Sequence, residues 1–455
     1  MFLNNYQERD KYERSKLTVS SDVLNAKTRG QKIALELRRT MNHFFPDLYD
    51  RLEIISDPRK RKDYSMTEIL LAGIFLFTCK EGSRNAFNND RAKEQFLENY
   101  QTLFNKRLPH MDTVDEVLRA LENDELERLK ASLVTGLIDQ KVFKKFRLFD
   151  RYHRVAVDAT GVMSVKKGHC EYCLHKTSKN GVVTYFHNIL EAKLVTPNGF
   201  CIPLASEWIE NPEDYSKQDS EQKAFKRLAI KLKKFYPRLS ICIHADGLYP
   251  NDPFFSLCEF YGWEYIVTLK DKSLKSLWEE IDMELLVNIK NKKQWYHPQK
   301  RVVQSFRWLS NLKYKDHNLF WIECCEKNGD YQTRFVHISS IQADFENIET
   351  LSKSGRMRFK IENEGFNIQK NAGYAFSHKY SRVSGVAMKN YMSLLQIAHM
   401  FNQLYELSTF MQRFMIGKQT IKNLWKELIG SLCYQVIYCE QVQNLLGVRT
   451  QYRYW

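Results

Sequence analysis

Two aspartates in the sequence follow directly on apolar, strand-like segments and could hold a metal ion. Asp158 closes the segment RVAVD, and Asp246 closes the segment LSICIHAD. The ends of neighbouring strands in one sheet bring side chains from distant parts of a chain together on a rigid frame. Two carboxylates there repel each other unless a positive charge lies between them, and Mg²⁺ prefers carboxylate and water oxygens. Each aspartate alone could equally begin a turn, because Asp and Asp-Gly are common in turns.

The segments around these aspartates have the pattern of an α/β fold. Apolar and polar residues alternate in RVAVD, VVTYFHNILEAKLV and GFCIPLASEWI, which predicts three successive strands. The segment DSEQKAFKRLAIKLKKFYP has an amphipathic helical pattern, with Asp219 and Gln222 placed to form a capping box. LSICIHAD and WEYIVTLK predict two more strands with a helix between them. Together these elements predict a mixed sheet flanked by helices.

The rest of the chain changes pattern twice. Up to about residue 147 the periodicity is helical, and helical character returns from Gly355 onward. Between about residues 285 and 345, the segments QKRVVQSFRWLS, LFWIECCEK and TRFVHISS predict strands. This part of the sequence therefore indicates an inserted β subdomain.

The composition is that of a basic globular protein. The chain has 455 residues, 43% apolar and 27% charged, which excludes collagen-like, low-complexity and small disulfide-stapled proteins. Lys and Arg number 69 against 54 Asp and Glu, and this net charge of +15 suits a phosphate backbone. The charged N-terminus lacks a secretory signal, and the longest apolar run, Ile69 to Thr78, is too short to span a bilayer. We therefore expect an intracellular protein with no membrane partner and with reduced cysteines.

A second group of potential metal ligands lies in the segment HCEYCLH. His169, Cys170, Cys173 and His175 offer the two thiolates and two imidazoles that satisfy zinc. Their compact spacing is not that of a zinc finger, and no second Cys-x-x-Cys pair follows. Ordinary thiols and loop histidines are the alternative interpretation.

Three motifs in this order resemble the DDE transposases of bacterial insertion sequences, whose catalytic domain has a ribonuclease-H-like fold. They are VAVDATG, ICIHADGLY after a long helix, and RFKIENEGFNIQK after the β insertion. The resemblance covers roughly Arg154 to Asn402, and SRNAFNNDR near Ser83 is similar to the N-terminal region of such proteins. In that family two aspartates and a glutamate bind two magnesium ions. The resemblance thus implies that Asp158, Asp246 and Glu362 are the catalytic, metal-binding triad.

Helical periodicity by itself does not choose the third carboxylate. On an α-helix Glu362 shares a face with Phe359 and Phe366, whereas Glu364 shares one with Met357, Ile361 and Ile368. The resemblance favours Glu362, because the spacing of Arg358 and Glu362 matches a signature of the subgroup with an insertion.

That signature also contains a Tyr and a Lys, and this chain departs from it at both. Gly355 stands at the Tyr position and Gln369 at the Lys position, with Lys370 one residue further on. A shift of one residue rotates a helical side chain by about 100°. The resemblance implies DNA contacts for Arg358 and Lys370, and Lys270, at the end of WEYIVTLK, could also reach DNA.

The activity that the resemblance implies is that of a DNA transposase, which cleaves the ends of its mobile element and joins them to target DNA. The triad would use two Mg²⁺ ions, with Mn²⁺ as a substitute. The implied partner is double-stranded DNA bound by a homodimer, in the bacterial cytoplasm at the nucleoid. The alternatives are a ribonuclease-H-like nuclease without strand transfer and a domesticated transposase that only binds DNA.

The changes of pattern along the chain, together with the resemblance, divide the chain into four parts. In hairpin-forming relatives, an insertion of this kind supplies an aromatic side chain that holds a flipped base. Here the candidates are Trp295, Trp308 and Trp321, and the alternative for each is packing in the core. The parts are a helical DNA-binding region at 1–147, a catalytic domain at 148–271 and 350–402, an inserted β subdomain at 272–349, and a helical region at 403–455.

Overall fold

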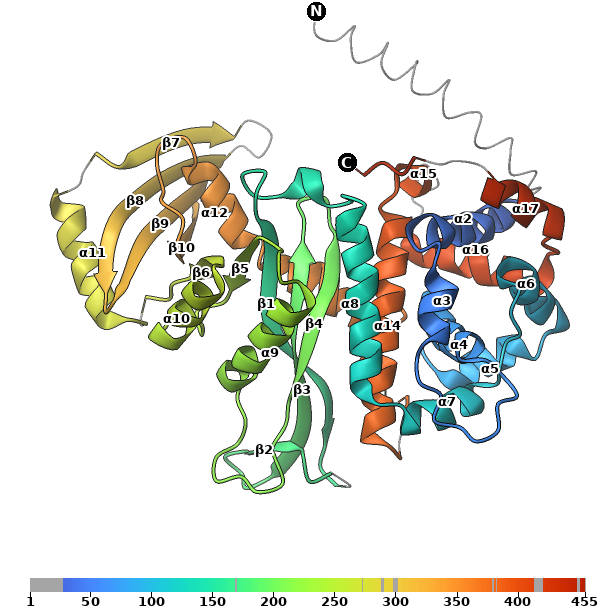
Figure 1. The fold of residues 1–455 in the computed structure, drawn as a ribbon. Helices are drawn as coiled ribbons and strands as arrows, with labels where there is room; N and C mark the ends of the chain where they lie inside the picture. The colour runs from blue at the N-terminus through green and yellow to red at the C-terminus, as the bar shows by residue number, and fades with distance from the viewer. Residues whose placement is uncertain are drawn as a thin grey trace, which may run out of the picture. The chain divides into compact units, whose positions relative to one another are not determined.

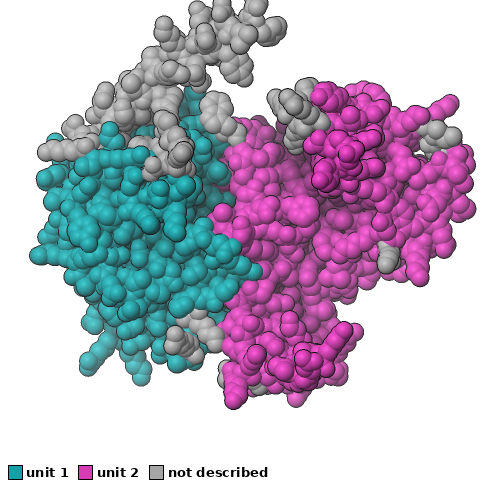
Figure 2. All heavy atoms as spheres, turned by 180° about the vertical axis from the view of Figure 1, so that it is seen from behind, with its two compact units in different colours: residues 1–133, 369–455 teal, residues 134–368 magenta. Residues whose placement is uncertain are grey.

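A computed structural model describes residues 28–167, 170–271, 273–287, 290–297, 302–378, 380–381, 383–412, 420–447 and 451–454. The chain forms two compact units, which Figure 2 distinguishes by colour. Unit 1 comprises residues 1–133 and 369–455, and unit 2 comprises residues 134–368. Helical segments from both ends of the chain thus fall in one unit, a different division from the four parts expected from the sequence.

The regular elements of unit 1 are all helices among its described residues (Figure 1). Helix α8 (Asn123–Asp139) begins in unit 1 and ends in unit 2, and α13 (Ile368–Asn371) lies at the other boundary. The remaining helices are α2 (Arg29–Phe44), α3 (Leu48–Glu53), α4 (Met66–Thr78), α5 (Arg84–Arg91), α6 (Glu94–Phe104), α7 (Met111–Ala120), α14 (Gly385–Glu406), α15 (Thr409–Gln412), α16 (Ile421–Tyr434) and α17 (Cys439–Gly447).

Helix α4 is the buried centre of unit 1. Every one of its residues is buried, so the longest apolar run of the sequence, Ile69 to Thr78, lies in a core helix. Ser65 and Glu68 form a capping box at its start. A Cβ added at Gly73 would lie 2.7 Å from Leu394 Cδ1, so the glycine lets α4 and α14 approach closely. No described helix has the length and hydropathy needed to cross a membrane.

Unit 2 is built on a ten-stranded mixed sheet, which confirms the α/β class. The order is β2-β3-β1-β5-β6-β10-β9-β8-β7, and β4 also pairs with β3. The β1–β5 and β5–β6 pairs are parallel and the other pairs are antiparallel. The strands are β1 (His153–Val165), β2 (Leu174–Thr177), β3 (Val183–Val195), β4 (Cys201–Ile209), β5 (Ile241–Ala245), β6 (Glu264–Thr268), β7 (Lys292–His297), β8 (Val302–Tyr314), β9 (His317–Asn328) and β10 (Tyr331–Ser339).

The strands expected as an inserted subdomain continue this sheet. Strand β10 pairs with β6, so β7 to β10 extend the sheet that carries Asp158. Alternation within each strand was visible in the sequence, but pairing between β6 and β10 depends on long-range contacts that local patterns do not encode.

Helices and short helical turns complete unit 2. Helix α9 contacts β3 and β4, and α12 contacts β6 and β8 to β10. The cap of α9 differs from the expectation: Ser220 is the N-cap and accepts from Lys223 N, while Asp219 bonds Arg227. The helices are α9 (Glu221–Phe235), α10 (Asp252–Tyr261), α11 (Lys275–Val287), α12 (Ile348–Arg356), the 3₁₀ turn η1 (Lys144–Phe146) and the π-helix η2 (Ile361–Asn367).

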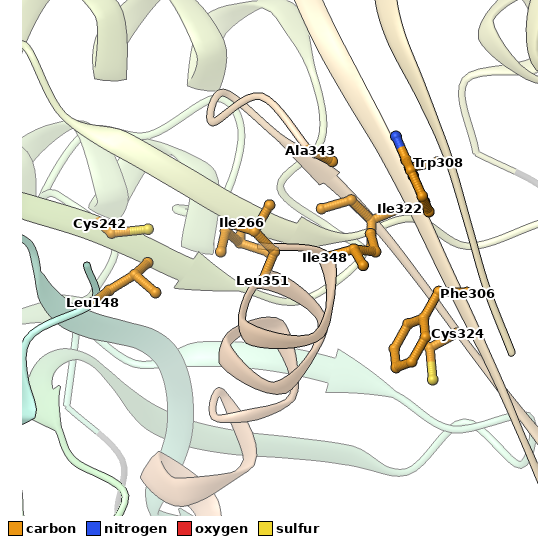
Figure 3. Packing of buried hydrophobic residues seen from close by; sticks show 10 residues of the cluster. All are labelled: Leu148, Cys242, Ile266, Phe306, Trp308, Ile322, Cys324, Ala343, Ile348 and Leu351. Carbon is orange, nitrogen blue, oxygen red and sulfur yellow. The ribbon is translucent and has the colours of Figure 1, made fainter. Parts of the chain in front are cut away.

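One apolar cluster fastens α12 to the sheet (Figure 3). Ile348 and Leu351 of α12 pack with side chains from β5, β6, β8 and β9. Burying a side chain of this size contributes about 1.5–3 kcal/mol. This packing fixes the N-terminal half of α12, the helix that precedes η2 in the chain. The cluster comprises Leu148, Cys242, Ile266, Phe306, Trp308, Ile322, Cys324, Ala343, Ile348 and Leu351.

Candidate active site

The two aspartates come from adjacent parallel strands. Asp158 lies within β1, which continues to Val165, and Asp246 follows the last residue of β5. Strands β1 and β5 are paired in parallel, with Val155 opposite Ile243. The residues before each aspartate are continuously buried, at 154–157 in β1 and 241–245 in β5, so Asp158 and Asp246 lie at equivalent positions on two strands of a rigid frame.

A single arginine joins Asp158 to Glu362. Arg358 Nη1 lies 2.5 Å from Glu362 Oε1 and 3.4 Å from Asp158 Oδ2. The arginine side chain is only 11% exposed, and that of Asp158 is 20% exposed. The two carboxylates are 204 positions apart in the chain. The guanidinium neutralises them only in part, because one positive charge faces two negative ones.

Glu362 stands on a π-helix, which the sequence did not predict. Helix α12 ends at Arg356, and η2 carries i→i+5 hydrogen bonds from Ile361 to Asn367. Ile361 and Phe366 both pack on Ala156 of β1 and its neighbours. In an α-helix these two side chains, five residues apart, would diverge by about 140°. The wider turn lets both face the sheet, and such π segments are frequent at functional sites.

The same geometry separates the two candidate glutamates. Phe359 is 50% exposed and Phe366 is 5% exposed, so the α-helical face that would place them together with Glu362 does not form. Glu362 shares Arg358 with Asp158, whereas Glu364 pairs with Lys360 at 2.7 Å. Among the two, Glu362 is the glutamate linked to Asp158.

Lys270 is brought to Asp246. Its Nζ lies 3.3 Å from Asp246 Oδ2, while Asp246 Oδ1 accepts from Leu248 N at 2.8 Å. The aliphatic part of Lys270 crosses Gly247, where an added Cβ would lie 2.5 Å from Lys270 Cγ. Gly247 thus leaves the space through which the lysine reaches the aspartate.

A fourth carboxylate joins this region. Glu221, in the first turn of α9, accepts a hydrogen bond from Tyr249 Oη at 2.8 Å. Burial raises the pKa of Glu221, the Tyr249 bond lowers it, and the charge of Asp246 raises it further. Sequence reasoning missed Glu221, because a glutamate in the first turn of a helix is common for local electrostatic reasons.

The pKa of Asp158 is raised by burial and by the other carboxylates near it. Burial raises it to about 7, against the opposing effect of Arg358, and the charges of Glu362 and Glu221 raise it further. A buried carboxylate with like charges around it is stabilised by a cation. The negative charge of these carboxylates thus exceeds the positive charge around them, and a divalent ion would balance it.

Among the described residues, the three carboxylates do not converge on a single point. Among the residues that the structure describes, Asp158, Asp246 and Glu362 do not offer three oxygens within 4.8 Å of one another. Two ions about 3.5–4 Å apart, each about 2.0–2.1 Å from its ligands, span a set of oxygens up to about 8 Å wide. The charges of Glu362 and Glu221 both act on Asp158.

The departures from the signature have structural reasons. An added Cβ at Gly355 would lie 2.6 Å from the ring of the buried His337, so no larger side chain fits there. Gln369 is fully buried and bonds His399 at 3.0 Å, and so cannot contact DNA from this conformation. Lys370 lies in unit 1 with its Nζ 5.6 Å from the Phe376 ring.

The tryptophans of the β7–β10 region divide into core and surface. Trp321 is fully buried and Trp308 is 6% exposed, and both therefore belong to the core. Trp295 on β7 is 36% exposed, with Lys353 Nζ 5.3 Å from its ring. Trp295 is the one of the three that offers a ring to solvent.

The histidine that lies beside the two cysteines among the described residues is His187, whereas the sequence suggested His169 and His175. Cys170 and Cys173 lie beside His187 on β3, with the sulfur-to-Nε2 distance 3.2 Å for each. His175 instead lies on β2 and pairs through its backbone with Gln218. His169 is outside the described residues. A histidine in an apolar strand gives no sequence signal for this role, since the strand register alone brings it to the cysteines.

No known protein-family model matches this chain, and no curated protein matches its sequence.

Proposed function

We propose that this chain is a DNA transposase of the DDE type, which cleaves the ends of its mobile element and joins them to target DNA. The observation that carries the proposal is the shared arginine: Arg358 ties Asp158 on β1 to Glu362 on the π-helix. Asp246 on the adjacent parallel strand supplies the third carboxylate. The strand order β4-β3-β1-β5-β6, three antiparallel strands beside two parallel ones, supports a ribonuclease-H-like core with β7 to β10 as its insertion.

Two Mg²⁺ ions, or Mn²⁺ in their place, would activate the attacking water or 3′-hydroxyl and stabilise the leaving 3′-oxygen. Asp158, Asp246 and Glu362 would hold them. Arg358 and Lys270, which neutralise carboxylates in this structure, would bind phosphates of the DNA once cations take over that role. Lys370 of unit 1 would add a phosphate contact. The net charge of +15 supports a polyanionic substrate, and joining two element ends calls for a homodimer assembled on DNA in the cytoplasm.

The proposal is tested with labelled DNA taken from both flanks of the reading frame. Magnesium-dependent cleavage at the flanks followed by joining to a second duplex supports transposition. Cleavage without joining would instead identify a ribonuclease-H-like nuclease, and binding without cleavage would identify a DNA-binding protein derived from a transposase.

A further inference from the structure

The strongest feature outside the carboxylate site is the cluster of Cys170, Cys173 and His187 in unit 2. The two sulfurs are 3.5 Å apart, and each lies 3.2 Å from His187 Nε2. Of the described residues, these three form the one group with a ligand atom each within 4.8 Å of one another. Three soft donors thus converge on one point.

These separations match a shared metal ion better than a disulfide. A disulfide holds its sulfurs about 2.05 Å apart. Tetrahedral zinc, with bonds of about 2.3 Å to sulfur and about 2.0–2.1 Å to nitrogen, separates two sulfurs by about 3.8 Å and sulfur from nitrogen by about 3.5 Å. The cluster needs to open by only a few tenths of an ångström to hold zinc.

The surroundings hold the ligands in place. Glu210 Oε1 lies 3.2 Å from His187 Nδ1, on the side of the ring away from the sulfurs. A carboxylate there favours the tautomer with the proton on Nδ1 and leaves the Nε2 lone pair directed at the metal. His187 is 3% exposed, so its orientation is fixed by packing.

The turn that carries the cysteines is also anchored. Cys173 N donates to Cys170 O at 3.3 Å, which closes the turn. Asn211 donates from Nδ2 to Cys173 O at 3.0 Å and from its backbone N to Tyr172 O at 3.0 Å. Asn211 is itself 1% exposed, so the turn is tied to a buried residue just beyond β4. Cys173 is buried and Cys170 is exposed, which leaves a path by which a metal ion enters.

We propose that Cys170, Cys173 and His187 bind a zinc ion that fastens the turn before β2 to strand β3. Two thiolates and one imidazole select zinc over magnesium, so this ion is distinct from the pair proposed at Asp158. Three protein ligands leave one tetrahedral position for water or a further ligand. By joining the turn before β2 to β3, the ion would stabilise the β2–β3 pair.

Metal analysis of the full-length chain, purified without a histidine tag, tests the inference. We expect about one zinc ion per chain, and its replacement by cobalt(II) should give the absorption of thiolate-bound tetrahedral cobalt. Cys173→Ser and His187→Gln should each lose most of the zinc. The matched control is Cys325→Ser, a partly buried cysteine on β9 outside the cluster, which should keep it.

Two further experiments apply if Cys173→Ser or His187→Gln fails to fold. In Cys170→Ser the altered side chain is exposed, so it should fold by circular dichroism and still lose zinc. Wild-type protein stripped by a chelator should regain one zinc ion on titration with zinc alone. A folded wild-type chain that neither contains nor takes up zinc, or a Cys170–Cys173 disulfide under reducing conditions, would overturn the inference. Asp158→Asn should retain zinc whatever its effect on DNA, which separates this result from that of the proposed function.

Discussion

Asp158 and Glu362 face the same nitrogen of Arg358, at 3.4 Å and 2.5 Å respectively. This arrangement connects the middle of a buried strand to a π-helix late in the chain. Glu364, two residues further on, pairs with a different cation, Lys360. The contrast between the two glutamates makes a direct comparison possible.

Glu362→Gln should weaken Mn²⁺ binding by more than about 100-fold, because it removes a ligand rather than an outer-shell group, whose loss typically costs 10–100-fold. Glu364→Gln on the same π-helix is the comparison and should change the affinity less than about 3-fold. Calorimetric titration of the protein with MnCl₂, without DNA, measures both. A larger loss in Glu364→Gln would assign the third carboxylate to Glu364.

Gly247→Ala should displace Lys270 from Asp246, because the new Cβ occupies the space of the lysine side chain. The fold should be retained within about 0.5 kcal/mol, as for most surface changes. We expect the slope of log affinity for DNA against log salt to fall by about 1, the value for one phosphate contact. The double variant with Lys270→Ala should behave like either single variant. Additive effects would show that Gly247 acts independently of Lys270.

Gly355→Ala should destabilise unit 2 by about 1–3 kcal/mol, the cost of overpacking against the ring of His337. Gly430→Ala on α16 is the control: its Cβ would meet nothing within 4 Å, and alanine gains up to about 1 kcal/mol in a helix interior. Urea denaturation measures both. Equal stabilities for the two variants would mean that His337 yields to the added methyl group.

Glu81 gives unit 1 a defined pH dependence. Burial, together with the charge of Asp90 and a hydrogen bond to it, raises the pKa of Glu81 from 4.5 to about 7. Because the folded-state pKa is the higher one, the stabilisation is complete below pH 4.5 and is lost as the pH rises to about 7. Glu81→Gln cannot ionise, so its stability relative to wild type should rise over that window and stay constant above it.

Thermal unfolding of wild type and Glu81→Gln at about pH 4 and about pH 8 measures the difference. Glu98→Gln, which alters an exposed glutamate on α6, serves as the control. A stability difference between Glu81→Gln and wild type that is the same at both pH values would contradict the buried-carboxyl account.

The sequence was sufficient for the strands that carry Asp158 and Asp246, because alternation in RVAVD and LSICIHAD is a local property. It was not sufficient for the π-helix, whose wide turn depends on the packing of Ile361 and Phe366 against β1, β3 and β4. The short β2 was missed for a similar reason, since four residues are too few to show a period. Local patterns thus predict helices and strands, whereas tertiary contacts decide whether a helix is an α-helix or a π-helix.

Long-range pairing explains what else could not be predicted. His187 meets Cys170 and Cys173 because β2 pairs with β3 with Leu174 opposite Phe186, which places Cys173 beside His187. No spacing in the sequence encodes that register. Glu221, at the start of α9, lies near both aspartates. Its charge raises the pKa of Asp158, and the charge of Asp246 raises the pKa of Glu221. Both residues look ordinary in the sequence.

The most direct test of the central claim is magnesium-dependent cleavage and joining of the flanking DNA by wild type and by Asp246→Asn. We predict that wild type yields joined products, and that Asp246→Asn binds the same DNA but loses both steps by more than about 100-fold. Asp282→Asn, which changes an exposed carboxylate on α11, should behave like wild type. Undiminished cleavage by Asp246→Asn would contradict the proposed active site.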